Sequence, residues 1–215
     1  MSEPLKKLPK AYQDGYVDFY GRKFFVTPDV LIPRPETEQM IDAVLNLAGK
    51  AYLPGVKPSK NVLPEKPVIL DVGTGSGCIG ITLKKELPEA EVYASDISEK
   101  ALEVAKKNAS GAPIYFIISH LLEKVKFTPD IIVANLPYVD ENWEWLDKDS
   151  LGYEPSLALY AKDHGLALIK ELIDTATSKY LILEADPCQH EEIIRYASKK
   201  YQLVETRGFI LVFKY

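Results

Sequence analysis

The stretch that decides the fold is Ile69-Leu70-Asp71-Val72-Gly73-Thr74-Gly75-Ser76-Gly77-Cys78-Ile79. It places glycine at three alternate positions, directly after a short apolar run and before a segment with helical periodicity. Glycine permits a tight turn and lets the backbone approach a ligand closely. The stretch therefore predicts a strand, a ligand-binding loop and a helix, with an ordinary strand-to-helix turn as the alternative.

An acidic residue completes this pattern about twenty residues further on, where a strand predicted at 91–95 ends at Asp96. A carboxylate at that position can accept both hydrogen bonds of a ribose diol. The glycine spacing is G-x-G-x-G rather than the dinucleotide G-x-G-x-x-G, and no lysine follows as in a triphosphate-binding loop. The sequence therefore favours a nucleoside ligand without a pyrophosphate.

Strand and helix patterns alternate from residue 68 onward. Strands are expected at 68–72, 91–95, 113–118, 130–134 and 180–184, and helices at 79–87, 99–108, 165–175 and 190–200. Such alternation predicts a parallel sheet covered on both faces. The final segments, 202–206 and 209–213, flank a tight turn at Gly208 and are expected to pair antiparallel.

The region before residue 68 has a different character. Aromatic stretches at 16–20 and 23–26 flank Gly21 and predict a β-hairpin. A helix is expected to begin at Pro35, and the proline-rich segment 50–67 reads as an exposed connection. We therefore divide the chain into a short extension over 1–67, with hairpin and helix, and an α/β domain over 68–215.

Composition excludes several classes of protein. The chain has 215 residues, 47% of them hydrophobic, and no apolar run approaches the ~18 residues of a membrane span. The start, MSEPLKKLPK, lacks the apolar stretch of a secretory signal, and two cysteines cannot build a disulfide framework, so a cytoplasmic protein is expected. No cluster of ligands accompanies Cys188 and His190, so no metal site is expected. The net charge of −5 disfavours nucleic acid.

The glycine loop followed by Asp96 resembles motif I of the S-adenosylmethionine-dependent methyltransferases. The resemblance implies the class I fold, an α/β Rossmann-like domain with a seven-stranded, mostly parallel sheet whose last strand is antiparallel. It implies S-adenosyl-L-methionine as cofactor, with Asp71 orienting the glycine loop. The implied cofactor-binding residues are Asp71, Gly73, Thr74, Gly75, Ser76, Gly77, Asp96, His120, Leu121 and Asn135.

His120 and Leu121 depart from that pattern. Methyltransferases usually carry an acid at the first position, where it receives the adenine amino group. A neutral imidazole nitrogen can accept the same hydrogen bond once its tautomer is fixed, and a partly exposed loop histidine is the alternative. Leu121 stands where relatives often have an aromatic residue, so apolar contact replaces stacking.

A second loop, Asn135-Leu136-Pro137-Tyr138, follows the buried strand expected at 130–134. In open α/β sheets such strand ends face the ligand crevice. The lone pair of a planar nitrogen is delocalised, so a site that methylates one must hold both N–H groups with acceptors. The Asn135 side-chain oxygen and the Leu136 carbonyl are suitable acceptors, and Tyr138 is a candidate to pack over the planar group. These four residues form the candidate catalytic loop, which we call the acceptor loop after the methyl acceptor that it is expected to hold.

With these residues in view, the chain resembles the release-factor glutamine N5-methyltransferase (HemK-type) family over about residues 16–215. The most specific stretch is Phe25-Val26-Thr27-Pro28-Asp29-Val30-Leu31-Ile32-Pro33-Arg34-Pro35-Glu36-Thr37-Glu38. The segments 153–159 and 163–166, and Glu184 after the fifth strand, also look like the family. The resemblance implies methyl transfer to the glutamine amide of a release factor's Gly-Gly-Gln motif.

Departures keep alternatives open. Relatives have Asn-Pro-Pro-Tyr, and Leu136 instead matches ribosomal RNA adenine dimethyltransferases, so an N6-adenine methyltransferase acting on RNA or DNA is one alternative. Bacterial relatives carry an N-terminal helical domain that recognises the release factor, which about fifteen residues cannot form. A helper subunit is therefore a candidate partner, and a non-catalytic cofactor-binding subunit is the second alternative. The acidic run 138–153 and the residue after it read as a solvated loop or as a surface that steers a basic partner. Its acids are Asp140, Glu141, Glu144, Asp147, Asp149 and Glu154.

Overall fold

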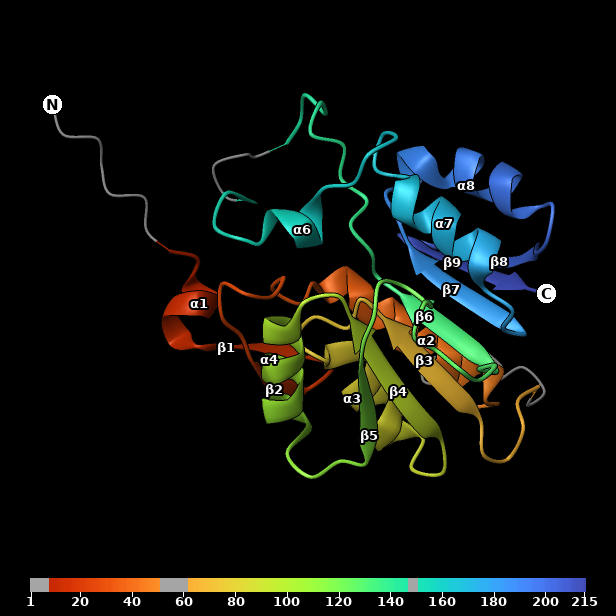
Figure 1. The fold of residues 1–215 in the computed structure, drawn as a ribbon, viewed down its shortest axis with the longest axis horizontal. Coiled ribbons are helices and arrows are strands. Elements are labelled where there is room, and N and C mark those ends of the chain that lie inside the picture. The colour runs from red at the N-terminus through yellow and green to blue at the C-terminus, as the bar shows by residue number, and fades with distance from the viewer. Residues whose placement is uncertain (1–7, 51–61, 147–150) are drawn as a thin grey trace, which may run out of the picture.

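The computed structural model describes residues 8–50, 62–146 and 151–215, and a seven-stranded sheet runs through its centre (Figure 1). The strand order is β5-β4-β3-β6-β7-β9-β8. The strands are β3 (Val68–Val72), β4 (Glu91–Asp96), β5 (Ile114–Ile118), β6 (Ile131–Ala134), β7 (Tyr180–Glu184), β8 (Gln202–Arg207) and β9 (Ile210–Lys214). Strand β9 is antiparallel to both neighbours, whereas β3 to β7 pair in parallel. The predicted class I methyltransferase sheet is confirmed.

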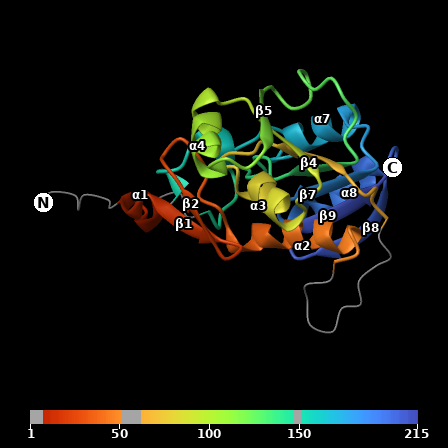
Figure 2. The same cartoon turned by 90° about the horizontal axis from the view of Figure 1, so that it is seen from below.

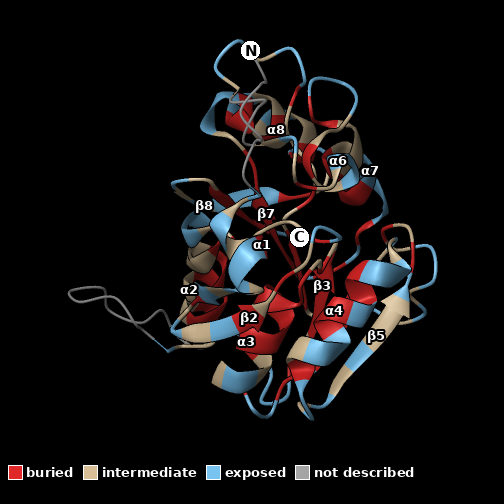
Figure 3. Cartoon of the chain, turned by 90° about the vertical axis from the view of Figure 1, so that its left-hand side faces the viewer, coloured by how far each residue is buried: buried red, intermediate tan, exposed pale blue. Residues whose placement is uncertain are grey.

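Helices cover both faces of this sheet, and alternate residues of each central strand show it. Ile69 of β3 packs in the same core cluster as α2 (Glu38–Leu47) and α3 (Cys78–Glu86). Leu70 faces the other way and packs with α7 (Ala167–Thr175) and α8 (His190–Ala197). Figure 2 shows α2 and α7 on opposite sides of the strands. Figure 3 shows the consequence in burial: strand β3 is buried, whereas the edge strand β5 is largely not.

The N-terminal region forms the expected hairpin. After α1 (Lys10–Asp14), strands β1 (Tyr16–Phe19) and β2 (Arg22–Phe25) pair antiparallel. Tyr20 and Gly21 between them have φ of +50° and +68°, as a two-residue turn of the I′ type requires. The 3₁₀ turn η1 (Pro35–Thr37) then leads into α2, with Pro35 at its first position.

Asn108 connects this hairpin to the glycine loop. It lies near the end of α4 (Glu99–Ala109), which packs against α3 and β2. Its Oδ1 accepts from the Phe25 N–H at 2.7 Å, and its Nδ2 donates to the carbonyls of Phe25 at 2.9 Å and Ser76 at 2.8 Å. One side chain therefore fixes the start of the 25–38 segment against the loop that follows β3.

Two short elements have no counterpart in the sequence prediction. They are α6 (Ser156–Leu159), in what was expected to be a long loop, and the 3₁₀ turn η2 (Pro187–Gln189) before α8. Both are too short for a hydrophobic period to reveal them. Much of the proline-rich connection (51–61) and part of the acidic run (147–150) lie outside the described residues. Within the described parts, no helix has both the length and the apolar character that crossing a membrane requires.

Candidate functional site

The glycine loop is held from below by Asp71. Its carboxyl is fully buried, and Oδ2 accepts from Thr74 Oγ1 at 2.6 Å and from the Gly80 N–H at 2.9 Å. Burial raises the pKa of Asp71 to about 6, although both hydrogen bonds lower it. Asp71 thus ties the loop to the first turns of α3 and does not itself reach the pocket above.

Close packing explains why glycines occupy this loop. Gly73 and Gly77 have φ of +72° and +82°, where side chains are disfavoured. A Cβ on Gly73 would lie 3.0 Å from Leu136 Cδ2, and one on Gly77 would lie 2.8 Å from Ile81 Cδ1. The loop therefore contacts α3 on one side and the Asn135–Tyr138 loop on the other.

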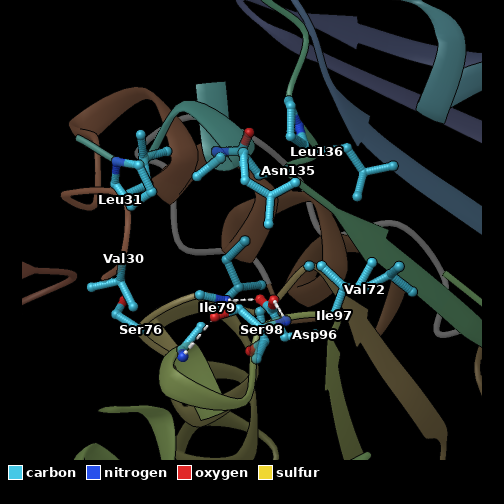
Figure 4. Close-up of a pocket in the computed structure, with 18 of the residues that line it drawn as sticks. Val30, Leu31, Val72, Ser76, Ile79, Asp96, Ile97, Ser98, Asn135 and Leu136 are labelled. Carbon is cyan, nitrogen blue, oxygen red and sulfur yellow. Dashed lines mark hydrogen bonds between the residues drawn. The ribbon is translucent and has the colours of Figure 1, made fainter. Parts of the chain in front are cut away.

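Asp96, at the end of β4, is fixed by two backbone donors. Oδ2 accepts from the Gly75 N–H and Oδ1 from the Ser98 N–H, each at 2.9 Å. Burial raises the pKa of Asp96, and these hydrogen bonds lower it. Each oxygen keeps a further lone pair, so the carboxylate can accept from a diol without losing its own supports. Figure 4 shows Asp96 beside Ile97 and Ser98, across the pocket from Asn135 and Leu136.

One pocket of about 270 Å³ brings most of the predicted site residues together, near the lower end of the ~300–1,000 Å³ typical of small-molecule sites. Those that line it are Gly73, Thr74, Gly75, Ser76, Asp96, His120, Leu121, Asn135, Leu136 and Pro137. Asp71, Gly77 and Tyr138 are not among the lining residues. Within the described ranges, no group of three or more His, Cys, Asp or Glu side chains is placed to hold a metal ion.

The 25–38 segment forms a wall of the same pocket. Val30, Leu31 and Thr37 line it. Sequence patterns assign these three residues no individual role, although their segment is the most specific stretch of the resemblance. Sequence patterns also do not predict Ile97 as a lining residue. Ile97 directly follows Asp96 in the chain and lines the pocket next to it. The signal that pointed to these residues was proximity in sequence to recognised motifs.

Glu154 attaches this wall to the chain beyond the acceptor loop. Its carboxylate forms an ion pair with Arg34 and accepts from the Ile32 N–H at 2.9 Å. Its side chain is 4% exposed. Asp140 also has partners within the chain: its carboxylate accepts a hydrogen bond from the Asn142 N–H and contacts His164 Nδ1 at 2.8 Å. Both acids are buried, so the prediction of a solvated run is wrong for Asp140 and Glu154.

The acceptor loop Asn135–Tyr138 is fixed by polar contacts to three other elements. Asn135 Nδ2 donates to Thr37 Oγ1 at 3.1 Å, and the Tyr138 hydroxyl donates to Glu184 Oε1 at 3.2 Å. The Tyr138 carbonyl accepts from Gln189 Nε2 at 2.8 Å. Tyr138 therefore points its hydroxyl toward the end of β7 rather than into the pocket, and the packing of its ring over a planar acceptor stays a prediction.

Glu184 lies beneath this loop and is 1% exposed. Burial raises the pKa of Glu184 to about 7, while the side chains of Thr37, Tyr138 and Asn135 lower it. Among the described residues, none gives Glu184 Oε2 a hydrogen bond of ordinary geometry. The acceptor loop thus packs on a buried carboxyl group, one oxygen of which has no hydrogen-bond partner among the described residues.

His120 and Leu121 lie at the rim formed by the loop after β5. His120 Nδ1 is 3.3 Å from Glu171 Oε1 and 3.8 Å from Glu123 Oε1. Leu121 has φ of +41°, an uncommon conformation for a branched side chain that is often found at binding sites. Both residues line the pocket, so the histidine is available to a ligand while its other face meets carboxylates.

The fold and the two loops define a methyltransferase of the α/β class, and solved structures share the architecture. The Mtq2–Trm112 complex of E. cuniculi, described as responsible for methylation of the eRF1 translation termination factor, superposes with a TM-score of 0.61 at 20% identity, covering 86% of this chain and 98% of that chain. The ribosomal protein L11 methylase of Lactobacillus delbrueckii subsp. bulgaricus gives 0.55 at 21% identity, covering 84% and 78%. The family model described as "Methyltransferase small domain" matches residues 58–146.

Sequence relatives narrow this class. The release factor glutamine methyltransferase of Flavobacterium psychrophilum is 38% identical over 94% of this chain and 68% of that protein. The enzyme of the same name from Koribacter versatilis is 41% identical over 76% of this chain and 56% of that protein. The chain belongs to the release factor glutamine methyltransferase family. It spans 56% to 63% of the length of the first four relatives compared.

Proposed function

We propose that this protein transfers a methyl group from S-adenosyl-L-methionine to the side-chain amide nitrogen (N5) of a glutamine in a peptide chain release factor. One observation carries the proposal: the glycine loop, Asp96 and the acceptor loop Asn135–Pro137 line one pocket. Leu136 packs directly against the glycine loop, so a cofactor group and an acceptor group held by these loops would be neighbours. Family membership supports the same activity.

The residues present fit the cofactor. The backbone at Gly75 is open, since a Cβ there would meet no atom within 4 Å, and this leaves room for a ligand to approach. Asp96 is ready to accept from a ribose diol, and Ile97 and Leu121 offer apolar surface beside it. We assign cofactor binding to Asp71 (through the loop), Gly73, Thr74, Gly75, Ser76, Gly77, Asp96, His120, Leu121 and Asn135. When bound, the cofactor supplies an electrophilic methyl group.

The chain's own contribution is to hold the acceptor nitrogen in line. The Asn135 Oδ1 and the Leu136 carbonyl accept the two N–H groups of a planar amide, which turns the nitrogen lone pair toward the cofactor. Orientation of this kind replaces a random encounter, and intramolecular positioning of reacting groups accelerates reactions by several orders of magnitude. No strong general base is required, because the amide proton leaves only after the nitrogen has acquired positive charge.

The partner that fits this reaction is the release factor itself, and we place the reaction in the cytoplasm, where translation terminates. Glu141 and Glu144 are exposed beside the acceptor loop and suit a basic partner better than phosphates. Residues 1–67 would act as a cap on the methyltransferase domain 68–215. A helper subunit remains a prediction that contacts within one chain do not test. The adenine-methylating alternative gains no support from the relatives named above.

The test offers labelled S-adenosylmethionine to the wild-type protein with either release factor or ribosomal RNA. Label is expected in the release factor and is expected to disappear when the Gly-Gly-Gln glutamine is replaced. Asn135→Ala should bind cofactor normally and lose most transfer, whereas Asn142→Ala, whose side chain bonds Asp140 and does not line the pocket, should keep it. Label found in RNA alone, or no cofactor binding by titration calorimetry, contradicts the proposal.

A further inference from the structure

Four polar side chains from three separate parts of the chain meet at the acceptor loop. Thr37 ends the η1 turn, Asn135 and Tyr138 belong to the loop after β6, and Glu184 ends β7. Two contacts have measured geometry: Asn135 Nδ2 to Thr37 Oγ1 at 3.1 Å, and the Tyr138 hydroxyl to Glu184 Oε1 at 3.2 Å. Thr37 and Glu184 are 2% and 1% exposed, so their side chains are shielded from bulk solvent.

When Glu184 is ionised, hydrogen-bond capacity fixes the direction of donation within this cluster. An ionised carboxylate only accepts, an amide nitrogen only donates, and a hydroxyl does one of each. Tyr138 donates to one oxygen of Glu184, and Oε2 has no partner of ordinary geometry among the described residues. The side chains of Thr37 and Asn135 also lie close enough to favour the ionised form of Glu184. Because Asn135 Nδ2 donates to Thr37 Oγ1, the Thr37 proton is free to point toward Glu184.

That direction decides which way the Asn135 amide faces. Because Thr37 Oγ1 must receive a proton, it selects the nitrogen of the Asn135 amide and leaves Oδ1 on the other side. The opposite orientation would direct the Thr37 proton to Asn135 Oδ1 and turn that oxygen, instead of the amide nitrogen, toward the Glu184 carboxyl. Asn135 also lines the pocket, so the atom that faces an acceptor is the amide oxygen.

We propose that Thr37 and Glu184 are positioning residues that orient the Asn135 amide, so that its oxygen receives an N–H of the methyl acceptor. The inference rests on the proposed function for the identity of the acceptor. It explains why a residue from the N-terminal extension lies in the wall of the pocket. It also restricts the substrate to planar groups that present an N–H donor to Asn135, as a primary amide does.

The test compares Thr37→Val, which removes the hydroxyl but keeps the branched shape, with Thr37→Ser, which keeps the hydroxyl. Thr37→Val is expected to lower kcat at least tenfold while the cofactor dissociation constant changes less than twofold. Thr37→Ser should return kcat to within about threefold of wild type. Glu184→Gln should lower kcat as Thr37→Val does, because a Gln amide can donate to Thr37 and release Asn135.

Thr82→Val is the matched control. Thr82 is a buried threonine of α3 outside the pocket lining, and its hydroxyl has no hydrogen-bond partner among the described residues. This variant should keep wild-type kcat. Equal kcat in Thr37→Val, Thr37→Ser and wild type overturns the positioning role. So does an equal loss of kcat in Thr37→Val and Thr82→Val, which would reflect any lost buried hydroxyl.

A second measurement does not depend on turnover. The side-chain amide protons of Asn135, assigned in ¹⁵N-labelled protein with the Asn135→Asp variant, should exchange slowly in wild type and rapidly in Thr37→Val. Rapid exchange in wild type overturns the positioning role. If wild-type protein fails to methylate release factor, the proposed function is wrong, and this exchange measurement still decides whether Thr37 orients Asn135.

Discussion

Gly165 offers the sharpest structural test, because its backbone touches the acceptor loop. It lies before α7, after Asp163 and His164, and all three have positive φ. A Cβ on Gly165 would lie 1.9 Å from the Tyr138 carbonyl oxygen and 2.6 Å from Gln189 Nε2. Both neighbours are fixed, since Gln189 Nε2 donates to the carbonyls of Tyr138 and His164 at 2.8 Å each. Gly165→Ala must therefore move the loop or break these bonds.

The cost can be worked out against a matched control. Gly111 has φ of +86°, close to the +84° of Gly165, but a Cβ there would meet nothing within 4 Å. For Gly111→Ala, left-handed strain of about 1–2 kcal/mol is partly offset by about 0.4–1 kcal/mol of lost unfolded-state entropy. A net loss of about 1 kcal/mol follows. Gly165→Ala adds two disrupted, partly buried hydrogen bonds at about 1–2 kcal/mol each, giving on the order of 4 kcal/mol.

The assay is thermal unfolding of both variants, followed by methyl transfer at a temperature where each is folded. At about 2–4 °C per kcal/mol for a chain of this size, Tm should fall by about 2–4 °C for Gly111→Ala and by about 8–16 °C for Gly165→Ala. Transfer should fall in Gly165→Ala alone, while cofactor affinity holds, because Tyr138 belongs to the acceptor loop. Equal Tm shifts in the two variants would refute the reasoning.

Three further predictions follow from single groups. Asp96→Asn turns one accepting oxygen into a donor against a backbone N–H, so the dissociation constant for S-adenosylmethionine should rise about 10- to 100-fold; calorimetry that shows no change would remove its assigned role. Burial raises the pKa of Glu184 from 4.5 to about 7 and the pKa of Asp71 to about 6. The native state therefore binds more protons than the unfolded chain between about pH 4.5 and 7, and the free energy of unfolding should fall as pH rises through that range. Glu184 should supply on the order of 3 kcal/mol of this change. Urea unfolding should show a flatter pH dependence in Glu184→Gln, and an identical one would contradict this origin. The pKa of both thiols is raised, that of Cys188 to about 11 and that of Cys78 to about 12, but Cys188 is exposed and Cys78 is buried. A thiol reagent at pH 8 should therefore modify Cys188 slowly in the native protein and reach Cys78 only in denaturant; labelling of both at the same rate would contradict the packing around α3.

The sheet was predictable because its signals are local. The run Val68–Val72, the glycine loop and α3 follow one another in sequence, so periodicity and glycine spacing place them within one residue of their observed bounds. The antiparallel position of β9 followed from the tight turn at Gly208, which allows no crossover. The four-residue α6 was missed, since a single helical turn carries no period.

The contacts between loops were not predictable, because nothing local encodes them. Asn135 and Thr37 are 98 residues apart, and Arg34 and Glu154 are 120 apart. Sequence alone does not distinguish Glu141 from Glu154, because both are glutamates in the same acidic region. In the structure Glu141 is exposed, whereas Glu154 is buried against Arg34. Burial depends on which distant backbone arrives beside a side chain, so composition assigned to Glu154 a surface role that it does not have.

These long-range contacts give a physical reason for the specificity of the 25–38 segment. At its start the Phe25 backbone bonds Asn108, near its middle Ile32 and Arg34 bond Glu154, and at its end Thr37 receives the amide of Asn135. The contacts at Ile32, Arg34 and Thr37 involve two buried side chains, Glu154 and Thr37, whose polar groups would otherwise lack these partners. Buried polar groups left unpaired cost more than the hydrogen bond itself contributes. The segment thus constrains three separate parts of the pocket wall at once. A replacement that preserved its hydrophobicity but not these donors and acceptors would keep the sheet and lose the geometry of the acceptor loop.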